Sequence, residues 1–112
     1  MRRVILESPF SGVDEREIAA NIRYARRAVR DSIMRDEAPL ASHLLYTQPG
    51  ILEDADPEQR ALGILAGLAW ASFAEAWVVY TDRGISQGMQ QGIDAAQIVG
   101  VPVEYRQIGA GA

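Results

Sequence analysis

A glycine- and serine-containing segment at residues 82–89 carries the residues best suited to chemistry in this sequence. It follows the apolar run Trp77–Tyr80 and precedes a stretch with helical periodicity. Backbone N–H groups without partners and the positive end of the helix dipole attract anions at a helix start. Turn formation and phosphate binding are equal alternatives for this segment. Its candidate ligand-binding residues are Asp82, Gly84, Ser86, Gly88 and Met89.

Two other segments place polar and aromatic side chains directly after apolar runs. In the first, Phe10 can cover a base or a sugar while the serines donate hydrogen bonds; the alternative is a turn whose phenylalanine fills the core. In the second, His43 is the only histidine, and it is either a structural hydrogen-bonding residue or part of a site. The candidates in these two segments are Ser8, Phe10, Ser11, Gly12, His43 and Tyr46.

Three carboxylates follow or lie near the same segments, namely Glu7, Asp82 and Asp94. A pair of carboxylates can act as acid, base or nucleophile on a glycosidic bond. These three are therefore the candidate catalytic residues, although the sequence does not show which of them lie within reach of one another.

The composition excludes several other chemistries. The chain has no cysteine, which excludes thiolate catalysis, and with a single histidine we expect no metal site and no cofactor. All of its 11 basic residues are arginine, so a Schiff-base lysine and a P-loop lysine are excluded. The net charge of -4 argues against a nucleic-acid partner.

Residues 61–80 are apolar enough to raise the question of a membrane span. Glu75 lies within them, however, and a charge in lipid is costly, so a buried helix followed by a buried strand is the better interpretation. The N-terminal residues 1–7 lack the apolar core of a signal peptide. We therefore expect no membrane association and a cytoplasmic protein.

Alternating strand and helix patterns predict one α/β domain over residues 1–112, Rossmann-like or flavodoxin-like, with three layers. We expect a parallel four-stranded sheet in the order 2-1-3-4, with right-handed crossovers. Ligands in such sheets bind beyond the carboxyl ends of the strands, near residues 7–12, 42–46 and 81–89. The expected strands are 3–6, 38–45, 77–80 and 102–105, and the expected helices are 14–34, 58–74 and 88–99.

Gly63 and Gly67 lie one turn apart in the second expected helix. Each weakens a helix by about 1 kcal/mol relative to alanine, so close approach of a second helix or of a ligand should offset the cost. Because residues 62–70 are apolar, we expect this helix to pack across a homodimer or a higher homo-oligomer. Packing within the chain's own core is the alternative.

Taken together, these segments resemble the nucleoside 2-deoxyribosyltransferase superfamily. The resemblance rests on residues 7–12, His43, residues 74–79, the Ser86-Gln87-Gly88 helix start, and Ala96 with residues 100–103. Small phage and actinobacterial members of uncharacterised activity share the runs Ala41–Tyr46 and Gly84–Met89.

The resemblance implies a nucleotide site completed by a dimer partner. Ser86 and Gly88 match the turn that holds a 5′-phosphate. The position of the family's nucleophilic glutamate falls on Gly92, and that of its supporting aspartate falls near Gly67. The resemblance thus retains the binding half of the site, whereas neither glycine can supply the family's chemistry.

We therefore expect a domain that binds a nucleotide or a nucleotide-derived small molecule without family-type catalysis. For a phage protein this predicts sequestration of a nucleotide immune signal. The alternative is an N-glycosidase or deoxyribosyltransferase in which Glu7, Asp82 or Asp94 supplies a relocated carboxylate. A third class, a protein-interaction domain, predicts strand ends that are plugged by side chains.

Overall fold

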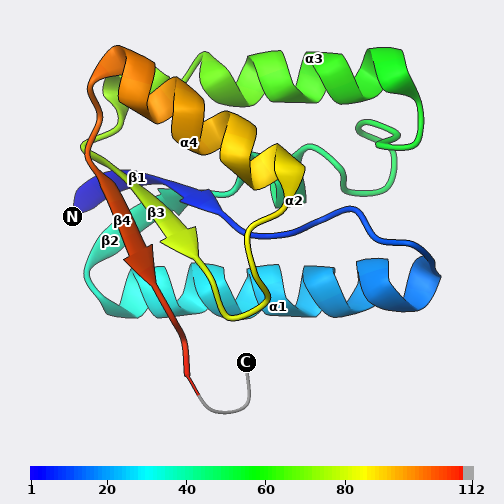
Figure 1. Ribbon diagram of the computed structural model, residues 1–112, viewed down its shortest axis with the longest axis horizontal. Helices are drawn as coiled ribbons and strands as arrows, with labels where there is room; N and C mark the ends of the chain where they lie inside the picture. Colours follow the sequence, from blue (N-terminus) through cyan, green and yellow to red (C-terminus); the bar gives the residue numbers. More distant parts are fainter. Residues whose placement is uncertain (110–112) are drawn as a thin grey trace.

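The computed structural model describes residues 1–109. It shows a parallel four-stranded sheet in the order β2-β1-β3-β4, with helix α1 on one face and helices α3 and α4 on the other (Figure 1). The predicted fold class and strand order are confirmed. The strands are β1 Arg2–Glu7, β2 Glu37–Leu40, β3 Ala76–Tyr80 and β4 Val103–Arg106; the helices are α1 Glu15–Met34, α2 Ser42–Leu45, α3 Pro57–Leu68, the 3-10 turn η1 Ala71–Phe73, and α4 Gln87–Val99.

The sheet separates two apolar cores. Alternate residues of β1 and β3, such as Leu6 and Val78, pack with Tyr24 of α1 on one face. On the other face, Trp77 packs with Met89 and other residues of α4. Every residue of β3 is buried, which explains why this strand reads as a continuous apolar run without alternation.

The second strand ends earlier than expected, at Leu40, and residues 42–45 form the short helix α2. The N–H groups of Leu44 and Leu45 both donate to the carbonyl of Ala41, and Leu44 packs against the core between the sheet and α1. A stretch this short and of mixed polarity suits a strand or a helical turn equally well, so its local sequence did not distinguish them. The consequence is that His43 is carried by a helix.

Helix α3 is also shorter than expected, since it ends at Leu68 and is followed by η1. Alanines continue past this end, so helix propensity gives no stop signal there. Ala71 is buried in the core and brings the chain back to β3. No helix within residues 1–109 is long and apolar enough to cross a membrane.

Candidate functional site

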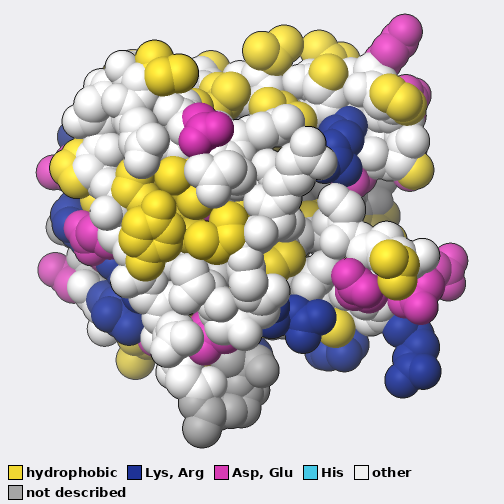
Figure 2. All heavy atoms as spheres, viewed as in Figure 1, with side chains coloured by type: hydrophobic (Ala, Val, Ile, Leu, Met, Phe, Trp, Pro, Cys, Tyr) yellow, Lys and Arg dark blue, Asp and Glu magenta, His cyan; other side chains and the backbone are white. Residues whose placement is uncertain are grey.

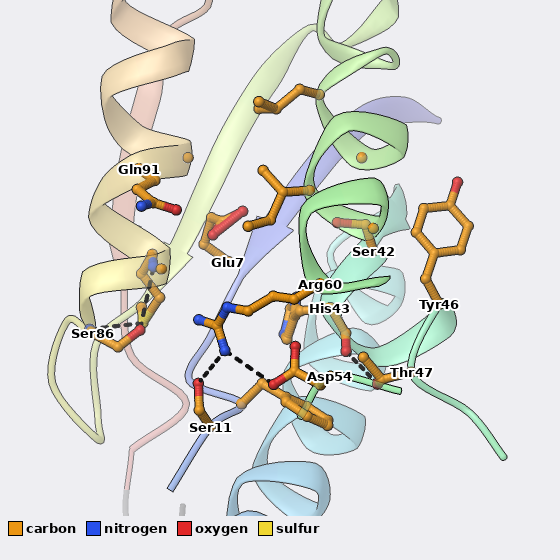
Figure 3. A pocket seen from close by; sticks show the side chains of 18 of the residues that line it. Glu7, Ser11, Ser42, His43, Tyr46, Thr47, Asp54, Arg60, Ser86 and Gln91 are labelled. Atoms are coloured by element: carbon orange, nitrogen blue, oxygen red, sulfur yellow. Dashed lines mark hydrogen bonds and ion pairs between the residues drawn. The ribbon is translucent and has the colours of Figure 1, made fainter. Parts of the chain in front are cut away.

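A pocket lies beyond the carboxyl ends of β1 and β3, in the cleft between α3 and α4 (Figure 3). It is the position that the strand order predicts for a ligand. Its wall includes the segment that follows β1, helix α2 and the start of α4. Of the sequence-predicted residues, the pocket is lined by Glu7, Ser8, Phe10, Ser11, His43, Tyr46, Ser86, Gly88 and Met89.

Four of the sequence-predicted residues lie elsewhere. The Asp82 carboxylate accepts hydrogen bonds from the Tyr24 hydroxyl and from the backbone N–H groups of residues 108 and 109, so it secures the segment after β4. Asp94 is exposed on α4 and accepts a hydrogen bond from Gln90. Gly84 is exposed, with a φ of 84° that favours glycine, and Gly12 packs against α1. The structure does not bring these residues to the pocket.

Glu7 reaches the pocket from the last position of β1, and Figure 3 shows it between α4 and α3. Its carboxyl lies against the backbone of Gly92. A β-carbon built on Gly92 would be 2.7 Å from Cδ and Oε1 of Glu7 and 2.9 Å from Oε2. Burial raises the pKa of Glu7 to about 8, and the nearby indole N–H of Trp77 opposes part of that rise. The carboxyl is therefore mostly protonated at pH 7.

Ser8 and His43 form a hydrogen-bonded pair beside Glu7, with 2.6 Å between Oγ and Nε2. Burial lowers the pKa of His43 to about 4, so the imidazole is neutral at pH 7. Its Nδ1 is buried and has no hydrogen-bond partner among the described residues. A buried nitrogen that lacks a proton costs less unpaired than a buried N–H, which favours the tautomer with the proton on Nε2. His43 then donates to Ser8 and leaves the serine hydroxyl free to donate to a ligand.

Arg60 is the principal pocket residue that sequence reasoning missed. It lies in the first turn of α3, forms an ion pair with Asp54 at 3.1 Å, and donates to Ser11 Oγ at 3.3 Å. Its Nη2 is 3.8 Å from a β-carbon built on Gly88, so the guanidinium lies beside the first turn of α4. The one sequence signal is that Arg60 is the sole arginine between Arg35 and Arg83. Its helix does not follow a strand directly, and the strand-end rule therefore did not select it.

The start of α4 supplies hydrogen-bond donors next to Arg60. Ser86 caps the helix, because its Oγ accepts from the backbone N–H of Met89 at 3.2 Å. The serine hydroxyl proton stays available. The N–H groups of Gln87 and Gly88 lie in the first turn, where no intrahelical acceptor exists. Donors, a positive helix end and a guanidinium thus converge, which is the chemistry that binds an anion.

The glycines of α3 face the chain's own residues. A β-carbon on Gly67 would lie 2.5 Å from Ser42 Oγ, and one on Gly63 would lie 3.3 Å from Leu52 Cδ1. The expectation that these two glycines mediate packing between protomers is therefore wrong, and the alternative of packing within the chain is correct. The outer side of α3 nevertheless carries exposed hydrophobic side chains (Figure 2).

Metal-binding geometry is absent from the described part of the chain, since no three His, Asp or Glu side chains converge there. The family model for the domain of unknown function DUF7768 matches residues 2–106. The chain belongs to this family.

The DUF7768 chain also resembles a solved structure of 2-deoxyribosyltransferase from Bacillus psychrosaccharolyticus. The TM-score is 0.60 and the identity 18%, and the match covers 98% of this chain and 75% of that one. At this identity the likeness establishes a shared fold, which confirms the resemblance at the level of the fold. The search of curated proteins found no match for the DUF7768 chain.

Proposed function

We propose that this domain binds a nucleotide or a nucleotide-derived small molecule in the pocket between α3 and α4, without cleaving it by the chemistry of deoxyribosyltransferases. The observation that carries this proposal is the position of Arg60 beside the first turn of α4. A phosphate placed there would accept hydrogen bonds from the N–H groups of Gln87 and Gly88 and would meet the guanidinium. Ser11 and Ser86 offer further hydroxyl donors at the same end of the pocket.

The remainder of the pocket suits a ring. Aromatic and aliphatic side chains provide most of the exposed area of its wall, as is usual for small-molecule sites, and polar side chains are interspersed among them. The ring-bearing residues Phe10 and Tyr46 lie on the side of β1 and α2, and Met89 lies on α4. A planar base can pack against such surfaces while its phosphate reaches Arg60.

Two features argue against family-type catalysis. Glycine stands at positions 67 and 92, where the resemblance implies the supporting aspartate and the nucleophilic glutamate. Glu7 lies close to the second of these positions, but its raised pKa leaves it mostly neutral at pH 7. A neutral carboxylic acid is a poor nucleophile, so binding is favoured over covalent chemistry.

Binding without turnover is consistent with a protein that holds its ligand. In a phage such a domain would act by sequestering a nucleotide-derived immune signal, present at no more than the concentration of the protein. This role requires tight stoichiometric binding and release of an unchanged ligand.

A second candidate function is an N-glycosidase or deoxyribosyltransferase with a relocated carboxylate. The observation that favours it is the contact between Glu7 and Gly92, which puts a carboxyl close to the position of the family's nucleophile. In this reaction the ionised Glu7 would bond to the anomeric carbon, and the base would leave with the electrons of the glycosidic bond. Asp82 and Asp94 lie outside the pocket, and the pocket's other carboxylate, Asp54, is paired with Arg60, so Glu7 is the carboxylate on which this function depends.

We further propose that the domain forms a homodimer or a higher homo-oligomer through the outer side of α3. Leu62 and Leu65 are exposed there by 58% and 65%, and Trp70 and Phe73 extend the apolar surface beyond the end of the helix. A soluble monomer rarely leaves so many large apolar side chains together in water.

Calorimetric titration tests the proposed function, with deoxynucleoside monophosphates, cyclic nucleotides and ADP-ribose derivatives as probes, followed by chromatography of the recovered ligand. Tight binding with intact ligand supports binding without cleavage, whereas recovered free base supports the second function. The matched variant is Ser86→Asp, which puts a negative charge at the expected phosphate position and should abolish binding, while its carboxylate keeps the helix cap. If binding survives this change, the phosphate assignment is wrong.

A further inference from the structure

The carboxyl of Glu7 is seated in the pocket wall by its contact with Gly92 and by the nearby indole N–H of Trp77. Both of its oxygens lie almost equally far from the position of a β-carbon on Gly92, at 2.7 and 2.9 Å, so the flat carboxyl group rests on the bare backbone of α4. The donor that acts on this carboxyl is the indole N–H of Trp77, which is buried and has no other partner among residues 1–109. No cation and no second donor reaches the carboxyl from the described residues of the pocket wall, and the strand ends are where ligands of such sheets bind, so the carboxyl has an edge to offer to a ligand.

The ionisation of Glu7 follows from its neighbours. The other titratable groups that line the pocket are Arg60 of α3, Asp54 before that helix, His43 of α2 and Tyr46 at the end of α2. Arg60 is paired with Asp54, and His43 is neutral and bonded to Ser8. The segments of β1, β3 and α4 that line the pocket bring no other ionisable side chain. No cation pairs with Glu7, and desolvation then dominates and keeps the proton on it at pH 7.

We infer that Glu7 recognises the base of the bound nucleotide as a neutral carboxylic acid. Its O–H donates a hydrogen bond to the base and its C=O accepts one from it, so the base must carry an acceptor next to a donor on one edge. This inference rests on the proposed function and names its ligand class, which is a phosphate ester carrying a nucleobase and not a sugar phosphate alone. Adenine, with a ring nitrogen next to an amino group, has such an edge.

The spacing of the two ends of the site agrees with this assignment. Arg60 lies against Gly88 and Glu7 lies against Gly92, one helical turn further along α4. Four residues of a helix rise about 6 Å, so a sugar-sized group fits between an anion at Gly88 and a base at Gly92. Gly88 leaves the wall of α4 open at the anion end of this path, and the carboxyl of Glu7 occupies the space beside Gly92 at the other end.

The test is calorimetric titration with adenosine 5′-monophosphate, the same nucleotide lacking the amino group (purine riboside 5′-monophosphate), and ribose 5-phosphate, at pH 7 and pH 9. The phosphate is a dianion at both values, so only the protein's titration differs. We expect the adenine nucleotide to bind most tightly and ribose 5-phosphate least. The affinity for the adenine nucleotide should fall about tenfold from pH 7 to pH 9, because the pKa of Glu7 is about 8 and only the protein with a protonated Glu7 binds the base.

The variant Glu7→Gln keeps one donor and one acceptor but does not titrate, so it should bind the adenine nucleotide equally at pH 7 and pH 9. Glu7→Ala should lose the preference for the adenine nucleotide while still binding ribose 5-phosphate. An equal affinity of the unsubstituted protein at both pH values would overturn the inference and leave the proposed function standing. Release of free adenine that rises with pH and disappears in Glu7→Gln would overturn it in favour of catalysis. If neither nucleotide binds at pH 7, this inference fails, and the titration with deoxynucleoside monophosphates, cyclic nucleotides and ADP-ribose derivatives decides whether the proposed function fails with it.

Discussion

The carboxyl of Glu7 fills the space that a side chain at Gly92 would need, although the two residues are far apart in the sequence. Ser42 stands in the same relationship to Gly67, since its Oγ lies 2.5 Å from the position of a β-carbon there. Both glycines occupy positions where the superfamily resemblance implies a catalytic carboxylate. In each case a side chain, from the end of β1 or the start of α2, occupies the space that a side chain at the glycine would need.

The contact between Glu7 and Gly92 predicts a strong coupling between substitutions at the two positions. Gly92→Ala should lower the free energy of unfolding by about 1–3 kcal/mol, because the new β-carbon overlaps the carboxyl. In the Glu7→Ala background the same change should be neutral or stabilising, because the overlap is gone and alanine favours the helix by about 1 kcal/mol. Urea unfolding of the four proteins of the cycle measures the coupling.

Gly88→Ala is the matched control for this cycle. A β-carbon there would lie 3.8 Å from its nearest neighbour outside the helix backbone, an ordinary contact distance, so the substitution should not destabilise the helix. Additive effects of Gly92→Ala and Glu7→Ala would show that the carboxyl is not seated against α4.

Glu37 predicts how the fold responds to acid. Its buried carboxylate accepts hydrogen bonds from Arg106, Arg2 and Ser32, which together hold its pKa at about 2 despite burial. Because the pKa is lower in the folded than in the unfolded chain, this group stabilises the fold above about pH 4.5. That stabilisation, roughly 3 kcal/mol, is lost as the pH falls from about 4.5 to 2.

Thermal unfolding of the native protein and of Glu37→Gln between pH 2 and pH 7 measures this contribution. The variant should be less stable at pH 7, because two arginines lose a buried carboxylate, and its stability should depend less on pH in the acid range. If the stabilities of the two proteins fell equally as the pH is lowered from about 4.5 to 2, Glu37 would not be the source of the acid sensitivity.

The sheet could be predicted from the sequence because its signals are local and redundant. The apolar runs at residues 4–6 and 77–80 are short, unbroken and soon followed by turn residues, which is typical of buried parallel strands. Each is separated from the next by a helix-length segment, and the handedness of the crossovers then limits the strand order. Residues 42–45 lacked such a signal, because four residues with mixed polarity fit a helical turn as well as a strand.

The pocket was only partly predictable, for a different reason. The strand-end rule located Glu7, Ser8 and Ser86, which lie at the end of a strand or in the segment between a strand and the next helix. Arg60 and Ser42 enter the pocket through packing of α3 on α2, and no local pattern encodes that packing. Asp82 follows β3 as expected, but partners distant in sequence turn its carboxylate away from the pocket. Position along the chain therefore identifies the edge of the sheet and not the direction of each side chain.

The exposed apolar side of α3 predicts self-association. Leu65→Arg should convert the protein to a monomer or weaken its association at least tenfold, because a charge would be buried in the interface. Sedimentation or light scattering over a range of protein concentrations measures this. Ile98→Arg is the matched control, since Ile98 is 86% exposed on α4 and should not affect the assembly. A native protein that is monomeric at all concentrations would remove the proposal.

Arg60 and Asp54 form an ion pair where the phosphate is proposed to bind, so substitution of each residue should change the affinity for a phosphate-bearing ligand differently. Arg60→Gln should weaken binding of adenosine 5′-monophosphate by about 10- to 100-fold, because it removes a charge-assisted hydrogen bond and leaves Asp54 facing the phosphate. Asp54→Asn should have a smaller effect of either sign, because it frees the guanidinium but also loosens it.

Adenosine separates this role from a general effect on the pocket. Because it lacks the phosphate, its affinity should change little in Arg60→Gln, whereas a collapsed pocket would lose both ligands. Arg27→Gln, an exposed arginine on α1 on the other side of the sheet, controls for the change in net charge. An equal loss for adenosine and its monophosphate in Arg60→Gln would mean that Arg60 shapes the pocket and that the anion binds elsewhere.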